Sequence, residues 1–275
     1  MDQGRRTGAY SDTDQMIVSA AHEIRDDDVV YVGVGLPMLA SLLAKYTHAP
    51  NCKIILQNGI IRTSSFPLPM GTDSLGSQTL AEQLDGLFYV NCLGQAGFIS
   101  AGFLGAGQVD RYGNVNDTAI GDYHNPVHRW SGSGGGNDVI SFCGRTIIIL
   151  RQTKQRFPEE VDFNTCPGYL DGKPGQREKA GMPPDTGPAV VITNLGIYGF
   201  KDREMTLRSV HAGVGVTPDQ AKAEVGWDLR VSSGLTDTEP PTQEELSILH
   251  EKVDPAGMWA GGRAQFNQGS NKDKA

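Results

Sequence analysis

Short apolar runs recur along the chain, and most of them are closed by polar turns that contain glycine. Runs of this length are typical of buried strands, whereas apolar residues spaced three and four positions apart indicate amphipathic helices. The two patterns alternate through the N-terminal half, which predicts an α/β fold. The predicted strands are 29–32, 54–56, 88–90, 99–107 and 146–150, and the predicted helices are about 15–24 and 38–45.

Three more strands are predicted close together toward the C-terminus. Val190–Thr193 and Ile197–Phe200 flank a glycine-containing turn, so we expect a hairpin, with Met205–Val210 as a third strand. Thr217-Pro218 and Pro241-Thr242 have the composition of helix starts. They predict helices that run to about residue 225 and over about 243–252.

The run Lys53–Leu56 ends in the polar tripeptide Gln57-Asn58-Gly59. Open α/β sheets bind ligands at the carboxyl ends of their strands, so we expect the Gln57 side chain at that edge. The tripeptide has a second interpretation, because Asn-Gly is the strongest short signal for a β-hairpin turn. Taken alone it favours the hairpin, while its neighbours along the chain favour a site.

Two glycine-rich loops accompany this tripeptide. Gly33-Val34-Gly35 leads from a predicted strand into a helix, and 132–136 holds four glycines in five positions. The backbone N–H groups of such loops suit phosphate or an oxygen that carries negative charge. A Gly-x-Gly alone is weak evidence, and a purely structural turn stays open for the first loop. For the second loop, a flexible linker is disfavoured because an apolar strand follows closely.

Composition narrows the class of protein. With 275 residues, 38% of them hydrophobic, the chain can bury a full core as one large domain or as two fused lobes. A net charge of −8 and a pI near 5.2 argue against a nucleic-acid-binding surface, where a basic face is expected. An anionic ligand therefore needs a local pocket.

Localisation and cysteine chemistry also follow from composition. No apolar stretch has the length of a transmembrane helix and residues 1–14 lack the core of a signal peptide, so we expect a cytoplasmic protein without a membrane partner.

The cysteines are scattered without metal-ligand spacing, so no metal site is predicted. We expect reduced, mostly buried thiols, with a nucleophilic cysteine as the less favoured alternative. They are Cys52, Cys92, Cys143 and Cys166.

The domain organisation is predicted to be simple. Residues 1–12 are expected to form a flexible leader, 13–258 a single α/β domain and 259–275 a disordered tail. Within the domain, 62–78 is a long polar segment with three bulky apolar residues, which is more typical of a functional loop than of a linker. It could cover a pocket.

Five motifs in one order resemble the β subunit of family I CoA-transferases, and most closely that of the glutaconate enzymes. They are Val-Gly-Val-Gly-Leu-Pro (32–37), Leu-Gln-Asn-Gly (56–59), Gly-Ala-Gly-Gln-Val-Asp-Arg-Tyr-Gly-Asn-Val-Asn (105–116), Gly-Ser-Gly-Gly-Gly-Asn-Asp (132–138) and Val-Asp-Phe-Asn-Thr-Cys-Pro-Gly-Tyr-Leu-Asp-Gly (161–172). The resemblance implies an open, mostly parallel sheet flanked by helices. It also implies a homologous α subunit as partner and acyl-CoA as substrate, with coenzyme A entering only as part of that substrate.

This sequence departs from the family pattern at the position of the catalytic residue. In this family a glutamate in a Glu-Ser-Gly or Glu-Asn-Gly turn attacks the acyl-CoA, and here that position is Gln57. An amide nitrogen, whose lone pair is delocalised, cannot make that attack. The first hypothesis is therefore hydrolytic ring opening or decarboxylation of an acyl-CoA, with the reactive base on the partner subunit. True CoA transfer, through another carboxylate or with an engineered Gln57, and a non-enzymatic metabolite-binding subunit remain the alternatives.

The expected site follows from these motifs. Gln57 and the backbone of Gly134, Gly135 and Gly136 are expected to be catalytic, the glycines as oxyanion donors. Substrate binding is expected from Gly33, Gly35, Asn58, Gly59, Gly107, Asn137, Asp138 and Arg62. Arg62 or Arg111 could pair with a free carboxylate of a dicarboxylic or oxo-carboxylic acyl group, although either could be a surface residue. His124 could supply an acid or base, but is more typical of a structural hydrogen-bonding group.

Overall fold

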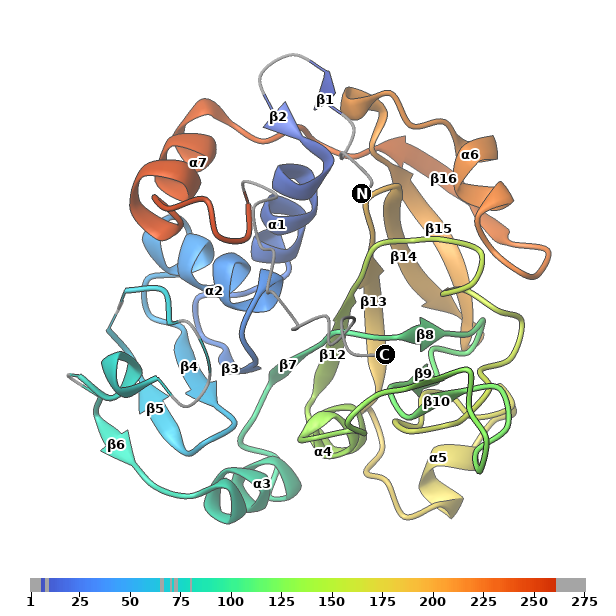
Figure 1. Cartoon of the computed structure of the whole chain (residues 1–275), viewed down its shortest axis with the longest axis horizontal. Coiled ribbons are helices and arrows are strands. Elements are labelled where there is room, and N and C mark those ends of the chain that lie inside the picture. The colour runs from blue at the N-terminus through green and yellow to red at the C-terminus, as the bar shows by residue number, and fades with distance from the viewer. Residues whose placement is uncertain are drawn as a thin grey trace, which may run out of the picture.

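The computed structural model describes residues 6–7, 10–64, 67–69, 71, 74–79 and 81–260. In this part of the chain ten strands form one sheet (Figure 1). Their order across the sheet is β16-β15-β14-β13-β12-β7-β3-β4-β5-β6. The neighbours β7 and β3 are far apart in sequence, so the chain crosses over the sheet between them as expected for an α/β fold.

The centre of the sheet is parallel and both sides carry antiparallel strands. The parallel strands are β3 (Val29–Val32), β4 (Lys53–Leu56), β7 (Ala101–Leu104), β12 (Arg145–Ile149) and β13 (Pro188–Ile192). The flanking antiparallel strands are β5 (Ile60–Arg62), β6 (Gln83–Leu84), β14 (Gly196–Lys201) and β15 (Glu204–Val210). β16 (Arg230–Asp237) returns parallel to β15. The predicted fold class is confirmed, with one further antiparallel edge at β5 and β6.

Two apolar clusters cover the two faces of the sheet. Val30 and Val32 belong to one cluster and Tyr31 to the other, as the two-residue period of a strand requires. Helices α1 (Asp12–His22) and α2 (Leu36–Tyr46) fill the first cluster, together with the π-helical turn η3 (Ile248–Val253), which packs on α2. Figure 1 shows α1, α2 and α7 (Gln243–Ser247) grouped on that side.

The opposite face is covered by shorter elements. Helix α4 (Gly136–Phe142) packs on β7 and β12, with α3 (Leu87–Gln95) beside it. Helix α6 (Pro218–Ala223) contributes Ala221 to the same cluster. The remaining short helices are α5 (Gln176–Lys179), η1 (Leu75–Gln78) and η2 (Ala212–Val214).

The helix starts follow the sequence signals. Thr217 and Thr242 each accept a hydrogen bond from the backbone N–H three residues on, which completes a capping box. Ser11 does the same for α1, so this helix begins at Asp12 rather than near residue 15. The π-helical turn η3 continues α7 to Val253, in agreement with the predicted last helix.

Three small antiparallel ladders lie outside the main sheet. β8 (Gln108–Val109) pairs with β9 (Val115–Asn116), and the chain turns between them through Tyr112-Gly113-Asn114. β10 (Ala119–Ile120) pairs with β11 (His128–Arg129). β1 (Arg6–Thr7) pairs with β2 (Tyr10–Ser11), so the described part of the expected leader forms regular structure.

Three local predictions need correction. Residues 88–90 belong to α3 rather than to a strand, because the buried positions Val90 and Gly94 stand four residues apart as on one face of a helix. The strand predicted over 99–107 is shorter, since β7 ends at Leu104. Trp259 and Ala260, which were predicted to belong to the tail, are bonded to the domain, because the Asp254 carboxylate accepts their N–H groups. The rest of the tail, like Phe66 and Met70 of the 62–78 segment, lies outside the described residues.

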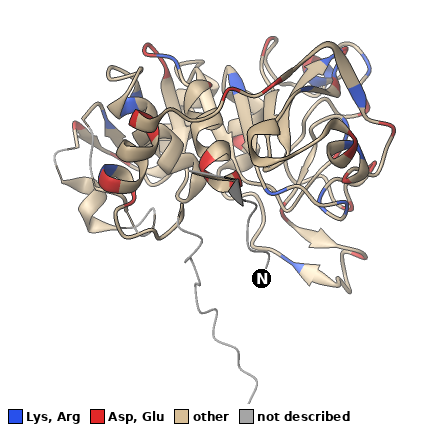
Figure 2. Ribbon diagram, turned by 90° about the horizontal axis from the view of Figure 1, so that it is seen from above, with Lys and Arg blue, Asp and Glu red and all other residues tan. Residues whose placement is uncertain are grey.

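Charged side chains are interspersed over the surface. Figure 2 shows Lys and Arg alternating with Asp and Glu around the periphery. This distribution offers no extended single-sign face in that view, so an anionic ligand would again depend on a local site.

Candidate active site at the carboxyl edge of the sheet

A cavity of about 380 Å³ opens where β3, β4 and β7 end. Gly33, Gln57 and Gly105 each follow the last residue of one of these strands directly, and all three line the cavity. Since the strands are parallel, their carboxyl ends share one edge of the sheet, which is where ligands bind in open α/β folds. The rest of the lining is Tyr31, Phe103, Leu104, Ala106, Gly107, Asp117, Trp130, Ser133, Gly135, Gly136, Val139 and Arg156.

Gln57 lies at this edge, as expected. Leu56 belongs to the cluster under α1 and α2 and Ile55 to the cluster on the α4 face, so alternation directs Gln57 to the α4 face. A Cβ atom added to Gly134 would lie 3.4 Å from Gln57 Nε2, and one added to Gly135 would lie 3.5 Å from Gln57 Cδ. The carboxamide therefore lies against the glycine-rich loop.

The Gln57-Asn58-Gly59 turn is at the same time a hairpin turn. β4 and β5 pair antiparallel across it, and the Gly59 N–H donates to the Leu56 carbonyl at 3.0 Å. Gly59 has φ +97°, and an added Cβ would lie 2.1 Å from the Asp85 carbonyl oxygen, so the turn requires glycine. The two interpretations of the tripeptide are thus compatible, because the hairpin presents Gln57 to the cavity. Gly59 itself supports the turn and is not part of the lining.

The loop at 132–136 is held in a turn of its own. Gly132 and Gly134 have φ of +95° and +50°, and the Gly136 N–H donates to the Ser133 carbonyl at 2.7 Å. Gly136 is therefore not the oxyanion donor that the motif predicted, because its N–H is already used within the loop. Among the described residues no acceptor reaches the N–H of Gly134 or Gly135.

Tyr31 is a site residue that the sequence analysis missed. Its hydroxyl is buried and has no hydrogen-bond partner in the described part of the chain. The same hydroxyl lies 2.5 Å from where a Cβ on Gly135 would be, so it shares the space beside Gln57. Burial, with the charge of Asp138 nearby, raises the pKa of Tyr31, which keeps the hydroxyl protonated and able to donate. An unpaired buried hydroxyl at the wall of a cavity is a feature of ligand sites.

Asp117 and Arg156 are two further lining residues that the sequence analysis did not place at this cavity. Asp117 Oδ1 accepts the Gly107 N–H at 2.6 Å. Arg156 donates from Nη2 to the Ala106 carbonyl at 2.8 Å and from Nε to the Gly107 carbonyl at 3.2 Å. Burial raises the pKa of Asp117, while the nearby Arg156 charge and the Gly107 N–H oppose that rise. In the described lining these two residues are the carboxylate and the cation.

The other expected glycines divide between the cavity and its support. Gly33 lines the cavity and has open space where a Cβ would be. Gly107 also lines it, closely packed against Trp130. Gly35 does not line it, because Trp259 covers this residue at 3.6 Å from an added Cβ.

The expected polar residues beside the motifs lie outside the lining. Asn58 is half-buried in the turn after Gln57. Asn137 is exposed and donates to the Thr165 carbonyl at 3.0 Å. Asp138 acts at longer range, since its charge contributes to the raised pKa values of Tyr31 and of two neighbouring thiols.

Neither arginine that was predicted to bind a substrate carboxylate lines the cavity. Arg62 is buried and donates to the Ser77 and Thr79 carbonyls at 2.7 and 2.6 Å, so it fastens the described end of the 62–78 segment. Arg111 pairs with Glu204 at 2.5 Å and with Glu159 at 3.3 Å, away from the cavity lining. His124 is exposed in a turn capped by Asp122 and does not line the cavity.

The cysteine thiols beside this site are buried and protonated. Burial raises the pKa values of Cys143 and Cys166 to about 12, so both thiols stay protonated at neutral pH. Cys52 is buried too, while Cys92 is exposed on α3. Within the described residues, no three His, Cys, Asp or Glu side chains are grouped as metal ligands.

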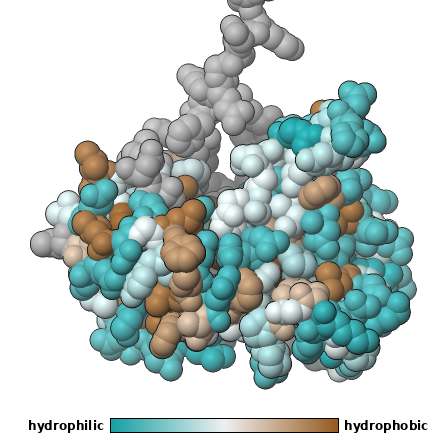
Figure 3. All heavy atoms as spheres, turned by 90° about the horizontal axis from the view of Figure 1, so that it is seen from below, coloured by the Kyte–Doolittle hydropathy of each residue, from teal (hydrophilic) through white to brown (hydrophobic). Residues whose placement is uncertain are grey.

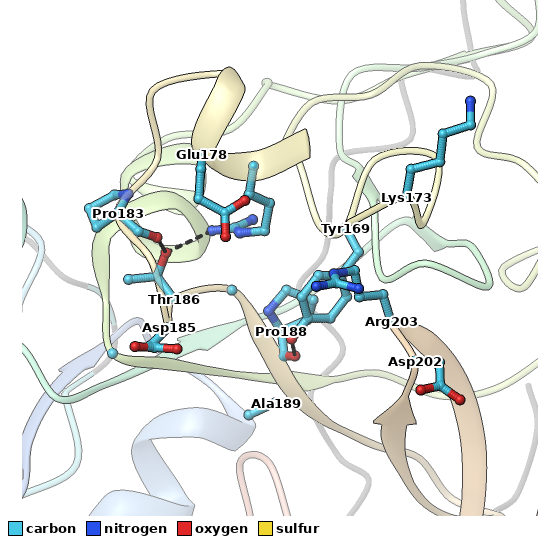
Figure 4. A pocket seen from close by; sticks show the side chains of 13 residues that line it. Tyr169, Lys173, Glu178, Pro183, Asp185, Thr186, Pro188, Ala189, Asp202 and Arg203 are labelled. Carbon is cyan, nitrogen blue, oxygen red and sulfur yellow. Dashed lines mark hydrogen bonds between the residues drawn. The ribbon is translucent and has the colours of Figure 1, made fainter. Parts of the chain in front are cut away.

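A larger cavity of about 540 Å³ lies at the opposite edge of the sheet (Figure 4). Gly144, Gly187 and Pro188 line it, and they stand where β12 and β13 begin. Two of the charged side chains in its described lining, Arg177 and Lys173, are bonded within the chain. Arg177 donates to the Pro167, Gly168 and Ile140 carbonyls and to Thr186, and Lys173 pairs with Asp171 at 2.7 Å. None of the residues predicted for the site lies here.

Comparison with known proteins identifies the family. The model of the coenzyme A transferase family matches residues 13–218, and this span contains the whole glycine-rich edge. The chain belongs to the coenzyme A transferase family. A glutaconate CoA-transferase subunit of Acidaminococcus fermentans is 34% identical over 252 residues, which cover 90% of this chain and 93% of that one. The crystal structure of this enzyme superposes with a TM-score of 0.86 and 31% identity, over 93% of this chain and 99% of that one.

Two further proteins resemble this chain along most of its length. A 3-oxoadipate CoA-transferase subunit of Pseudomonas knackmussii is 36% identical over 248 residues, 88% of this chain and 92% of the relative. A cholesterol ring-cleaving hydrolase IpdB subunit of Mycobacterium tuberculosis is 25% identical over 256 residues, 88% of this chain and 94% of the relative. None of the described helices is long and apolar enough to span a membrane.

Proposed function

We propose that this member of the coenzyme A transferase family is the β subunit of an enzyme that cleaves an acyl-CoA without forming a covalent intermediate on its own sheet edge. The favoured reactions are hydrolytic ring opening of a cyclic oxo-acyl-CoA and decarboxylation. The observation that carries this proposal is the carboxamide of Gln57, which borders the cavity where nucleophilic attack would need a carboxylate.

The groups around Gln57 favour binding of a carbonyl oxygen. Gln57 Nε2, the N–H groups of Gly134 and Gly135 and the Tyr31 hydroxyl are all donors and are neighbours of one another, although Gly134 contacts Gln57 without lining the cavity. Donors aimed at a developing oxyanion contribute up to about 3 kcal/mol each to transition-state stabilisation. This set suits an acyl-CoA carbonyl that gains negative charge during attack or during loss of a carbon group.

A partner subunit fits the surface of the chain. The relatives are named as subunits, and large apolar side chains are exposed on η1, β6 and α3. They are Leu75, Leu84, Leu87, Phe88 and Tyr89, and apolar atoms gather on that side of the molecule (Figure 3). Exposed apolar groups of this size favour a protein interface. We infer a heteromer with a homologous α subunit.

The acyl group is proposed to be dicarboxylic or oxo-carboxylic. The two relatives of highest identity described above carry glutaconate and 3-oxoadipate in their names. Arg156 is the cation in the described lining and replaces Arg62 and Arg111 as the candidate partner of a free carboxylate.

True CoA transfer is the second candidate, and the two relatives at 34% and 36% identity favour it. In that case a different carboxylate would have to accept the acyl group. The ring-cleaving hydrolase subunit, although only 25% identical, favours the first candidate.

Water labelled with oxygen-18 separates the two candidates. The heteromer, isolated through a tag on this chain, is incubated with 2-oxocyclohexanecarboxyl-CoA in labelled water, with acetate as a possible acceptor. Ring opening predicts an open-chain acyl-CoA that carries one labelled carboxylate oxygen. Intact ring acid together with acetyl-CoA would instead establish transfer. A parallel incubation with glutaconyl-CoA tests decarboxylation through release of carbon dioxide.

A further inference from the structure

The cavity that holds Gln57 contains one acidic side chain in its described lining, Asp117. The residue comes directly after β9, on the connection between the two small ladders β8–β9 and β10–β11. The cavity therefore has a proton acceptor on this chain, although the residue at the sheet edge cannot serve as one.

The Asp117 carboxylate is held by one oxygen only. Oδ1 accepts the Gly107 N–H at 2.6 Å, and the Asp117 N–H donates to Thr165 Oγ1 at 2.9 Å. In the part of the chain that is described, no donor reaches Oδ2. A carboxylate fixed through one oxygen, with the other oxygen available, has the geometry of a general base.

The surroundings of Asp117 set its protonation. Arg156 and Cys166 are the titratable groups that interact with it electrostatically, and the Cys166 thiol is neutral because burial raises its pKa to about 12. Burial of Asp117 outweighs the opposing effects of the Gly107 N–H and the Arg156 charge, so its pKa is raised. A raised pKa brings a carboxylate closer to the operating range of a base near neutral pH.

We propose that Asp117 is the catalytic base of the cavity, and this inference rests on the hydrolytic function proposed above. One O–H bond of a water molecule breaks, and its proton passes to Asp117 Oδ2. The hydroxide electron pair forms the bond to the ring carbonyl carbon, and the π pair of that carbonyl moves to its oxygen. The π bond then re-forms as the ring carbon–carbon bond breaks, and the electron pair of the broken bond goes to the carbon beside the thioester. That carbon takes the proton back from Asp117, so ring and water give the open-chain acid with no other reactant.

A purely structural role for Asp117 is the competing explanation, because the carboxylate also fixes the Gly107 turn. Asp117→Asn separates the two roles. The amide oxygen of asparagine can still accept the Gly107 N–H, whereas the side chain can no longer take a proton. If the role is structural, Asp117→Asn should retain activity.

The test compares the wild-type heteromer with Asp117→Asn and Asp117→Glu in hydrolysis of 2-oxocyclohexanecarboxyl-CoA. Loss of a general base typically costs ~100-fold or more in kcat, so we expect that loss for Asp117→Asn with KM changed less than about threefold. Asp117→Glu is expected to recover part of the activity. In the wild type, kcat/KM should rise with pH through the Asp117 pKa, since only the carboxylate is active, and Asp117→Asn should lack this rise.

Asp162→Asn is the matched control, because Asp162 is an exposed aspartate that accepts a hydrogen bond from Gln108 and does not line the cavity. Thermal unfolding checks that each variant folds. Hydrolysis at wild-type rate by Asp117→Asn, with the pH rise intact, would overturn the assignment and leave the proposed function standing. Transfer without hydrolysis by the wild type would overturn both.

Discussion

The two edges of the central sheet carry cavities of opposite character. At the carboxyl edge the cavity is smaller, about 380 Å³, and borders a buried Tyr31 hydroxyl without a partner among the described residues. At the amino edge the cavity is larger, about 540 Å³, but Arg177 and Lys173 there are bonded within the chain. Cavity size therefore does not locate the site. The residues that directly follow the last positions of parallel strands do so, because ligands of open α/β folds bind at the carboxyl ends of those strands.

Gly135→Ala should have the largest effect on activity. The added Cβ would lie 2.5 Å from the Tyr31 hydroxyl oxygen, so either the loop or the ring must move. Displacement by about 1 Å at a reaction site can cost ~100-fold, and we expect a fall in kcat of that order in steady-state assays of the heteromer. Activity within twofold of the wild type would show that the loop does not border the reacting groups.

Arg177→Met should reduce stability and spare activity. The guanidinium is buried beside the amino-edge cavity and donates to three backbone carbonyls and to Thr186. Loss of these charge-assisted bonds should lower the free energy of unfolding by about 3 kcal/mol, measured by urea denaturation. Lys179→Met on the same short helix is the control, since Lys179 is exposed. A specific loss of turnover in Arg177→Met at full stability would contradict the distinction between the edges.

Tyr31→Phe should separate stability from function at the carboxyl edge. Removing a buried hydroxyl that lacks a partner in the described chain should not destabilise the protein and could stabilise it by about 1 kcal/mol. If the hydroxyl binds the substrate carbonyl, kcat/KM should fall about tenfold, the loss expected for one hydrogen bond. Denaturation and kinetics on the same preparation check both parts. Marked destabilisation would mean that the hydroxyl has a structural partner.

Lys173→Ala should have the smallest effect. Lys173 is exposed at the larger cavity, and an ion pair as exposed as the one it forms with Asp171 contributes little to stability because solvent screens it. We expect kcat/KM within twofold of the wild type and an unchanged melting temperature. A strong rise in KM for acyl-CoA would assign a ligand to the amino edge.

The sequence predicted where the site lies, at the carboxyl edge of the sheet, better than it predicted which residues act there. Alternation along Lys53–Leu56 and the polar turn after it were sufficient to place Gln57, because both signals are local. Tyr31 was missed because an aromatic residue inside an apolar strand has the pattern of a core residue. Its position two residues before Gly33 could have placed both on one face of the sheet.

The remaining errors came from contacts between distant residues. Arg62 has the composition of a binding residue, but its partners Ser77 and Thr79 follow a loop whose course local patterns do not determine. Asp117 reaches the cavity only because β8–β9 folds back and returns it to Gly107. Gly136 was predicted to donate to a ligand, and only the turn with Ser133 shows that its N–H is used.

Gln57→Glu tests the central claim most directly. The wild-type and variant heteromers are incubated with glutaconyl-CoA, treated with borohydride or hydroxylamine, and digested for mass spectrometry of this chain. The account predicts no modified carboxylate on the wild-type chain, and a modified residue 57 in the variant, because the substitution restores a nucleophile at the cavity wall. A wild-type chain that carries an acyl or CoA adduct on any aspartate or glutamate would contradict it.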